Sequence, residues 1–557
     1  MITAGPHGAR TRLYHRSGCQ ASSMPRDPIQ PSRDSTQLPR TATRAPRDPI
    51  QPSPDSTQSP LVLAIDIGTS SVRAILFDRT ARIASPAFQK TYDMDTTPDG
   101  GVHIDADRLA AEVASVLDDF CAWSGQATGV QAGAGHAGDG HGAIDGVAMT
   151  TFWHNVVGVE GDRAVTPLIS WADTRPGTVI PELGERLDAA STHGRTGCVL
   201  HASYLPAKIC WFARTDPETF ARVERWMSIG EYLFLKWFGA PACSVSMASG
   251  TGLFNAHRCD WDDETLAALP VARDQLTPVT DVDEPVRGLK GEFASRWPAL
   301  AGASWYPAIG DGACNNIGSG CVDEDRIALM VGTSGAMRIM RRAAEFTIPD
   351  GLWCYRSDRR RILMGGALSN GGNVYGWMRD TLRLADEQRV ERDLGGMAPD
   401  SHGLTVLPFW AGERSPGWHD AARAAITGMT LHTTPLDVMR ASLEATAYCF
   451  ANIHDRLRSI WGDTGEIVAS GAGLLQSPAW MQMLADVLER PITASTVTEA
   501  SSRGAALLAL EASGALEDLA AAPAPLGKTF EPDPANRDRY REAMKRQQDL
   551  YDMMMDS

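Results

Sequence analysis

The sequence predicts an α/β protein with two related domains, and two similar hairpins are the main reason. Residues 61–78 and 327–340 each contain an apolar strand, a turn rich in glycine, serine and threonine, and a second apolar strand. Segments with helical periodicity, such as 105–123, alternate with further apolar strands, such as 466–470. Two hairpins of one design indicate two related domains that face one ligand.

The turn of the first hairpin carries groups that suit an anionic ligand. Gly68 allows the backbone to turn tightly and to approach a ligand closely. Thr69 and Ser70 supply hydroxyl groups, and Arg73 supplies a positive charge. Asp66 stands where the first strand ends, so a metal ion could use its carboxylate. An ordinary hairpin with a polar turn explains these residues equally well when they are taken alone.

The first sixty residues differ in composition from the rest of the chain. They are rich in Pro, Ser, Thr and Arg, and segment 25–39 recurs with few changes at 46–60. Because such a composition cannot bury a core, we expect a disordered tail over 1–60. A dispensable tail, a start codon assigned too far upstream and a weak transit peptide are the alternatives. We expect an N-terminal domain over 61–320 and a C-terminal domain over 321–557.

Charge and cysteine content limit the classes of partner. The net charge of −16 argues against a broad nucleic-acid-binding surface. The ten cysteines show no CxxC pair or zinc-ligand spacing, which favours reduced thiols and a cytoplasmic protein. No apolar run reaches the roughly 20 residues of a membrane-spanning helix, so we expect no membrane partner. The oligomeric state stays open, with a homodimer as one alternative.

Several separated motifs occur together in a recognisable order. They are segments 66–70, 310–313, 332–335 and 470–473, with a longer segment at 428–447. On these motifs the chain resembles the FGGY family of carbohydrate kinases, and the resemblance covers about residues 61–510. The resemblance implies two actin-like, ribonuclease H-like ATPase domains facing a central cleft. It also implies phosphorylation of a sugar, sugar-acid or polyol hydroxyl by ATP.

Within this family the chain is most similar to gluconokinase-like members. Segments 152–154, 171–175 and 243–253 carry this similarity, whereas segment 412–416 is similar to xylulokinases. The expected substrate is therefore gluconate, converted to 6-phosphogluconate, and a xylulokinase or another sugar or polyol kinase is the alternative. A non-catalytic actin-like ATP-binding sensor or scaffold is an alternative of a different class.

The resemblance also implies which residues handle the phosphoryl group. Asp311 is the expected catalytic base, and Asp66 is expected to hold Mg²⁺ directly or through water. A scaffold would not need the base, so the presence of both acids favours an enzyme. The residues expected to contact ATP are Gly68, Thr69, Ser70, Arg73, Gly332, Thr333, Gly372, Gly471 and Gly473.

Substrate recognition is expected elsewhere in the chain. The candidates are His154, Trp171, Asp173 and Arg175. The histidine and the aspartate can bind hydroxyl groups, and the tryptophan can form an apolar wall. Arg175 could bind a carboxylate, or could instead pair with Asp173. Glu413 and Arg414 lie in the turn similar to xylulokinases, where bracing the interface between domains is the alternative to a role in the site.

Overall fold

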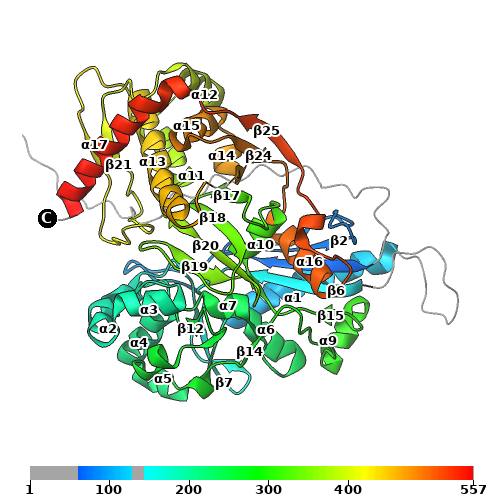
Figure 1. Cartoon of the computed structure of the whole chain (residues 1–557). Helices are drawn as coiled ribbons and strands as arrows, with labels where there is room; N and C mark the ends of the chain where they lie inside the picture. The colour runs from blue at the N-terminus through cyan, green and yellow to red at the C-terminus, as the bar shows by residue number, and fades with distance from the viewer. Residues whose placement is uncertain (1–59, 128–143, 385, 464, 556–557) are drawn as a thin grey trace, which may run out of the picture. The chain divides into compact units, whose positions relative to one another are not determined.

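Two β-sheets with the same strand pattern form the framework of the protein (Figure 1). The first follows the order β15–β6–β1–β2–β3, with β16 also beside β6, and the second follows β19–β20–β18–β17–β23–β24–β25. The strands of the first sheet are β1 Leu61–Ile67, β2 Ser71–Phe77, β3 Phe88–Thr91, β6 Ile144–Thr151, β15 Ser304–Trp305 and β16 Ile309–Gly310. Those of the second are β17 Arg326–Val331, β18 Gly335–Arg342, β19 Trp353–Arg356, β20 Arg361–Leu368, β23 Glu466–Ser470, β24 Ile492–Ser495 and β25 Leu526–Phe530.

Five consecutive strands of one sheet correspond to five of the other. In the first sheet, β15, β6 and β1 are parallel, and β2 and β3 follow in antiparallel pairing. In the second, β24, β23 and β17 are parallel, and β18 and β20 follow in antiparallel pairing. The predicted α/β fold with two related halves is therefore confirmed.

The computed structural model describes residues 60–127, 144–384, 386–463 and 465–555, all within one unit. The predicted disordered tail and most of the glycine-rich segment that follows α1 (Ala106–Ala127) lie outside these residues. No helix in the described ranges is long and apolar enough to cross a membrane.

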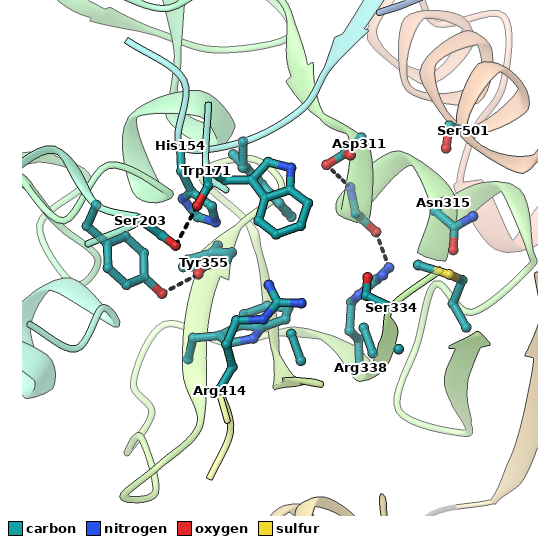
Figure 2. Close-up of a pocket in the computed structure, with 18 of the residues that line it drawn as sticks. His154, Trp171, Ser203, Asp311, Asn315, Ser334, Arg338, Tyr355, Arg414 and Ser501 are labelled. Carbon is teal, nitrogen blue, oxygen red and sulfur yellow. Dashed lines mark hydrogen bonds between the residues drawn. The ribbon is translucent and has the colours of Figure 1, made fainter. Parts of the chain in front are cut away.

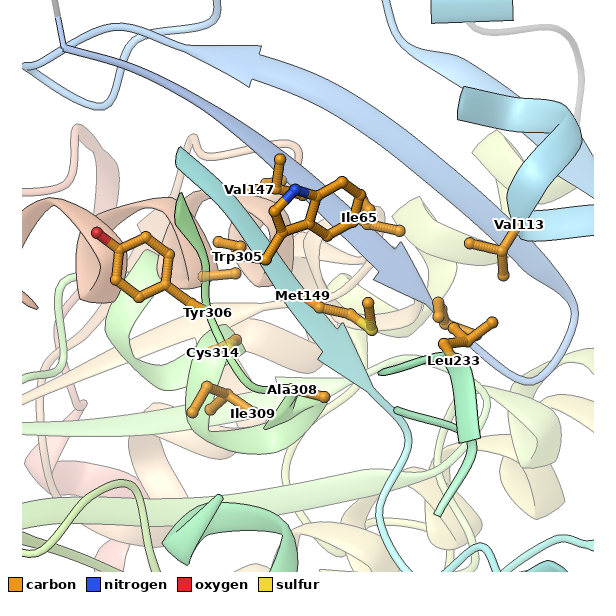
Figure 3. Packing of buried hydrophobic residues seen from close by; sticks show 14 of the residues in the cluster. Ile65, Val113, Val147, Met149, Leu233, Trp305, Tyr306, Ala308, Ile309 and Cys314 are labelled. Carbon is orange, nitrogen blue, oxygen red and sulfur yellow. The ribbon is translucent and has the colours of Figure 1, made fainter. Parts of the chain in front are cut away.

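Apolar side chains from distant parts of the chain pack against the first sheet. Figure 3 shows Ile65 of β1, Val147 and Met149 of β6, Val113 of α1 and Leu233 of α6 (Ile229–Phe238) among them. Every residue of β1 except Asp66 is buried, as expected of a central strand covered on both faces.

A helix from late in the sequence completes this core. Helix α16 (Ala500–Ala512) packs against β1, β6 and α10 (Asp311–Gly318), and its side chains from Ala505 to Leu510 belong to the core of the first sheet. Figure 1 shows α16, in orange, beside the blue and cyan strands. A segment that the sequence places in the C-terminal domain thus packs on the sheet of the N-terminal domain.

The chain between β6 and β15 contains a smaller helical region with its own core. Its helices are α2 Ile180–Arg186, α3 Ala189–Thr196, α4 Leu205–Thr215, α5 Pro217–Arg222, α7 Val245–Ser249 and α8 Asp263–Ala267. This region supplies one wall of the site described below.

Six helices in the described part of the chain belong to the second sheet. They are α11 Gly372–Thr381, α12 Glu387–Gly396, α13 Pro435–Trp461, α14 Ala472–Leu475, α15 Pro478–Leu488 and α17 Arg537–Met555. Helix α13 is buried along most of its length, charged residues such as Arg440 and Glu444 included, because β20, α15 and α17 pack around it.

Candidate functional site

The strand register of the first sheet brings two carboxylates to one edge. Asp66 of β1 lies beside Thr150 of β6, and Gly310 of β16 lies beside Thr151, the next residue of β6. Asp311 follows Gly310 directly and begins α10. The carboxyl ends of neighbouring parallel strands thus place the predicted metal ligand and the predicted base near each other, as in other open α/β sheets with ligands at this edge.

Burial changes the acidity of both carboxyl groups. The pKa of Asp66 is raised to about 7, chiefly by burial, with Arg73 opposing the change and the charges of Asp311 and Glu499 adding to it. Burial also raises the pKa of Asp311, and Arg338 opposes that change. Two partly buried acids that lie close together form a site suited to a cation or to proton transfer.

Arg73, predicted to contact phosphate, lies close to two carboxylates and an amide of the protein itself. Its guanidinium is 3.9 Å from a carboxylate oxygen of Asp66 and 3.5 Å from one of Glu499. Its Nε donates a hydrogen bond of 3.0 Å to Gln89. A phosphate contact by Arg73 stays a prediction.

The predicted nucleotide glycines of the second sheet lie against one another. The backbone N–H of Gly372 donates to the carbonyl of Gly332 at 2.9 Å. A Cβ on Gly372 would come within 2.4 Å of that carbonyl oxygen, and one on Gly473 within 3.0 Å. Gly471 has a φ of +89°, and a Cβ there would come within 2.4 Å of the carbonyl oxygen of Val331. These glycines allow β17, α11 and α14 to approach so closely that side chains do not fit between them.

The glycines of the two hairpin turns have a different environment. A Cβ on Gly68 would meet only the carbonyl oxygen of Ser71, at 3.5 Å, and one on Gly332 only the sulfur of Met330, at 3.7 Å. Neither turn needs a positive φ at these positions. Gly68 therefore does not owe its place to a left-handed backbone, although its N–H closes the turn onto the carbonyl of Ser71 at 2.9 Å. The open space above both turns suits a ligand that approaches the backbone, Thr69, Ser70 and Thr333 included.

A cavity of about 200 Å³ opens beside Asp311 (Figure 2). Both halves of the protein line it. The first half contributes Trp153, His154, Trp171, Ser203, Tyr204, Asp311, Gly312 and Asn315. The second contributes Met330, Ser334, Gly335, Ala336, Arg338, Trp353, Tyr355, Ala367, Arg414, Trp418 and Ser501. Aromatic walls with a few polar groups are typical of sites for small molecules.

His154 is held in a fixed orientation in this cavity. Its φ is +62°, and Nδ1 lies 2.5 Å from the carbonyl oxygen of Gly250. Burial lowers the pKa of His154 to about 3, so the ring is neutral. Because a carbonyl can only accept, Nδ1 carries the hydrogen, and Nε2 is left as an acceptor for a substrate hydroxyl.

Asp173 and Arg175 do not line the cavity. The guanidinium of Arg175 donates to the Asp173 carboxylate at 2.6, 3.0 and 3.2 Å, and it lies 4.6 Å from the ring centre of Trp211. Asp173 is buried and also accepts from the backbone N–H of Val102. Of the two alternatives for Arg175, the structure shows the pairing with Asp173. Two of the four expected substrate residues, His154 and Trp171, do line the cavity.

Two arginines of the second half line the cavity. Arg338 was not predicted from the sequence, and the role of Arg414 was left open. Arg338 is buried in β18, and its Nη1 donates to the carbonyl of Gly312 at 2.9 Å. A signal was present, because an arginine in the otherwise apolar strand 335–340 is unusual. Arg414 belongs to the turn noted in the sequence, and its guanidinium lies 5.2 Å from the ring centre of Trp171. Glu413 points elsewhere, to the hydroxyl of Tyr551 at 2.9 Å.

A second group of potential metal ligands has a structural explanation. Asp400, His402 and Glu444 lie close together. However, Arg440 donates to Glu444 at 2.7 Å, and Arg546 donates to Asp400 at 2.6 Å. These arginines neutralise the charges of the two acids, so the group is explained as an ion-pair network.

Comparison with known proteins agrees with this architecture. Residues 61–318 match the model of the FGGY family of carbohydrate kinases, N-terminal domain, and residues 327–513 match its C-terminal domain. A gluconokinase of Bacillus subtilis (strain 168) is 28% identical over 401 residues, which cover 70% of this chain and 78% of the relative. A glycerol kinase of Halorhodospira halophila (strain DSM 244 / SL1) is 30% identical over 501 residues, 86% of this chain and 94% of the relative.

A solved structure shows the same fold. The ligand-bound xylulose kinase from Lactobacillus acidophilus superposes with a TM-score of 0.80 at 24% identity, covering 89% of this chain and 98% of that chain. The three relatives carry three different substrate names, so they agree on the class of reaction and not on the substrate. With both family models matched along the chain, this protein belongs to the FGGY family of carbohydrate kinases.

Proposed function

We propose that the protein transfers the γ-phosphoryl group of ATP to a hydroxyl of a sugar acid, with gluconate as substrate and 6-phosphogluconate as product. The observation that carries the proposal is the position of Asp311. Its buried carboxylate lies at the edge of a sheet, beside a cavity with aromatic walls and opposite the glycine-rich turn of the second sheet. A phosphoryl-transfer enzyme needs a proton acceptor at the point where sugar and nucleotide meet.

In this proposal Asp311 accepts the proton of the attacking hydroxyl. The raised pKa of its carboxyl group makes it a better base than an exposed aspartate. Nε2 of His154 accepts a hydrogen bond from another hydroxyl of the sugar, and Trp171 covers the carbon chain. Arg338, next to Asp311, would stabilise the negative charge of the phosphoryl group during transfer.

Mg²⁺ fits the acidic edge of the first sheet. Asp66 and Asp311 are partly buried, the charge of Asp311 raises the pKa of Asp66, and Arg73 lies 3.9 Å from Asp66 as a counter-charge. Asp66 would hold the ion directly or through water, and the ion would supply neutralisation of the phosphate charge.

We assign the base, phosphate contacts and one wall of the sugar site to residues 61–320, and nucleotide binding to residues 321–557, which also line the sugar cavity. Gly332 and Thr333 would face the phosphates, opposite Gly68, Thr69 and Ser70. The contacts among Gly372, Gly471 and Gly473 leave backbone exposed to ribose and adenine, without side chains in the way. We place the reaction in the cytoplasm, where reduced thiols and ATP are both found.

A coupled assay of ADP release tests the proposal. The full-length protein is incubated with ATP and Mg²⁺ and with gluconate, xylulose, ribulose or glycerol in turn. The proposal expects gluconate to give the highest kcat/KM. A preference for xylulose or glycerol would establish the alternative kinases, and no stimulation by any of the four would favour the non-catalytic sensor or scaffold.

A further inference from the structure

The arginines around the cavity differ in how their charge is balanced. Arg175 makes a bidentate ion pair with Asp173, but outside the cavity. Arg338 lies next to Asp311, whose charge raises its pKa against the effect of burial. Arg414 has no carboxylate within ion-pair distance among the residues that the structure describes. Within the described residues Arg175 alone of the three has an ion pair, and the acid that acts on Arg414 is the exposed Asp420, not Asp311.

The hydrogen bonds of Arg414 leave most of its donors free. Nη2 donates to the carbonyl of Leu368 at 3.1 Å, while Nε is buried without a partner in the described part of the chain. The nearest acidic charge acting on Arg414 is that of Asp420, and that carboxylate is bound by His201 at 2.7 Å. A buried guanidinium with unsatisfied donors is costly unless a ligand completes it.

The backbone around Arg414 is firmly held. The N–H of Ser415 donates to the carbonyl of Ala367 at 3.0 Å, and the indole of Trp418 donates to the carbonyl of Gly351 at 2.9 Å. On the far side of the turn, the Glu413 carboxylate accepts from the hydroxyl of Tyr551. The turn that carries Arg414 is therefore held before any ligand arrives, and the contacts of the guanidinium with Leu368 and Trp171 reduce the entropy cost of binding.

The position of Arg414 separates it from the end where phosphate is transferred. Figure 2 shows Arg414 below Trp171, on the side of the cavity with Tyr355, whereas Ser334 and Asn315 lie on the other side. Ser334 belongs to the hairpin turn that we assign to the nucleotide. A ligand group at Arg414 would therefore belong to the sugar and not to ATP.

We propose that Arg414 binds the carboxylate of the substrate, so that the acid end lies against Trp171 and the hydroxyl to be phosphorylated lies at Asp311. This inference rests on the proposed function and names the residue that selects sugar acids. Arg414 thus takes the role that the sequence suggested for Arg175. The planar guanidinium suits two hydrogen bonds to one carboxylate.

Two ligands that differ in one group test this proposal. Gluconate and D-glucitol have the same hydroxyl chain, but D-glucitol has CH₂OH in place of the carboxylate. Calorimetry on the full-length protein measures the Kd of each, and the ADP-release assay measures kcat and KM. For the wild type we expect gluconate to bind about 100-fold more tightly than D-glucitol, the size expected when a buried charge pair is completed.

The variants are Arg414→Gln, Arg414→Lys and a control. Arg414→Gln should raise the Kd of gluconate about 100-fold and change that of D-glucitol less than about 3-fold. Arg414→Lys should fall between, because it keeps the charge and loses the two-point contact. Arg423→Gln is the control: Arg423 is exposed on the same loop and donates only to the backbone carbonyls of Asp420 and Ala422. It should change neither Kd.

The outcomes separate this inference from the kinase proposal. An equal loss of affinity for both ligands in Arg414→Gln would reveal a structural role and overturn the inference. Unchanged affinity for gluconate would overturn it as well. If the wild type phosphorylates xylulose or glycerol but does not bind gluconate, the inference fails while a kinase remains. If gluconate binds through Arg414 but releases no ADP, the proposed reaction fails and the binding inference stands.

Discussion

The two sheets share five strands in the same arrangement but carry different groups at the ends of their strands. In the first sheet the strand ends carry acids, Asp66 at β1 and Asp311 after β16. In the second they carry glycines, Gly332 after β17 and Gly471 after β23. One backbone design thus provides a charged edge in one half and an exposed main chain in the other.

The difference has a physical basis. Proton transfer and metal binding need ionisable groups whose pKa is shifted by their surroundings, and the first sheet provides two acids whose pKa is raised. A nucleotide held by its phosphates and adenosine needs backbone N–H groups and close approach, which glycine allows. Each of the following predictions changes one side of this comparison.

The largest effect is expected from Asp311→Asn. The variant should fold and bind ATP but lose kcat by about 10³-fold, because the hydroxyl proton loses its acceptor. The coupled ADP-release assay measures kcat, and equilibrium dialysis measures ATP binding. Turnover near that of the wild type would remove Asp311 from the role of base.

A methyl group added to one of the glycines of the second sheet should weaken the binding of the nucleotide instead. Gly372→Ala places a Cβ 2.4 Å from the carbonyl oxygen of Gly332, so the turn must shift. We expect the KM for ATP to rise about 10-fold or more, with a loss of stability of about 1–3 kcal/mol. Gly376→Ala, in the same helix with no atom near the added Cβ, is the control and should bind ATP normally. Equal behaviour of the two variants would contradict the assignment.

The charge on the acidic side can be tested through pH. The pKa of Asp66 is about 7 in the folded protein and 3.8 in its ordinary state, so between these values the folded state holds a proton that the unfolded state has released. Stability from this group therefore falls as pH rises through this window and is lowest above pH 7.

Asp66→Asn removes that penalty. In EDTA, the variant should gain in melting temperature relative to the wild type, and the gain should be larger at pH 8 than at pH 5. Added Mg²⁺ should raise the melting temperature of the wild type at pH 8 and leave the variant unchanged. A gain that is independent of pH would mean that the Asp66 carboxyl titrates normally.

The smallest effect is expected behind the turn that carries Arg414. Tyr551→Phe removes the hydrogen bond to Glu413, a buried acid whose pKa burial raises. We expect a loss of about 1 kcal/mol in the free energy of unfolding and a change in substrate affinity of less than about 3-fold. Denaturant unfolding and calorimetry check the two values. A large loss of affinity would show that α17 controls the cavity directly.

Local features of the sequence predicted much of the fold. The hairpins and strand 466–470 follow from apolar periodicity and from the residues that end each element, and the observed bounds of β23 are the expected ones. Asp311, His154 and Trp171 were identified through motifs and lie around one cavity.

The contacts that decide between alternative roles could not be predicted from the sequence, because they depend on the three-dimensional environment of each side chain. The pairing of Arg175 with Asp173 uses side chains two residues apart, and yet only the three-dimensional environment decides between that pair and a ligand. The proposed role of Arg414 depends on its place beside Trp171 and on an Nε without a partner in the described part of the chain, which spacing along the chain does not reveal. The burial of α13 arises because α15 and α17 cover its outer face.

The position of α16 has a consequence for how the protein is made. The strands of the first sheet end at Gly310, but residues 505–510, which complete its core, are synthesised roughly 200 residues later. The apolar face of the first sheet therefore stays partly uncovered until this segment of the second half has been synthesised. A fragment that stops at residue 320 would expose this apolar surface, and co-expression with the remaining fragment would be needed to cover it.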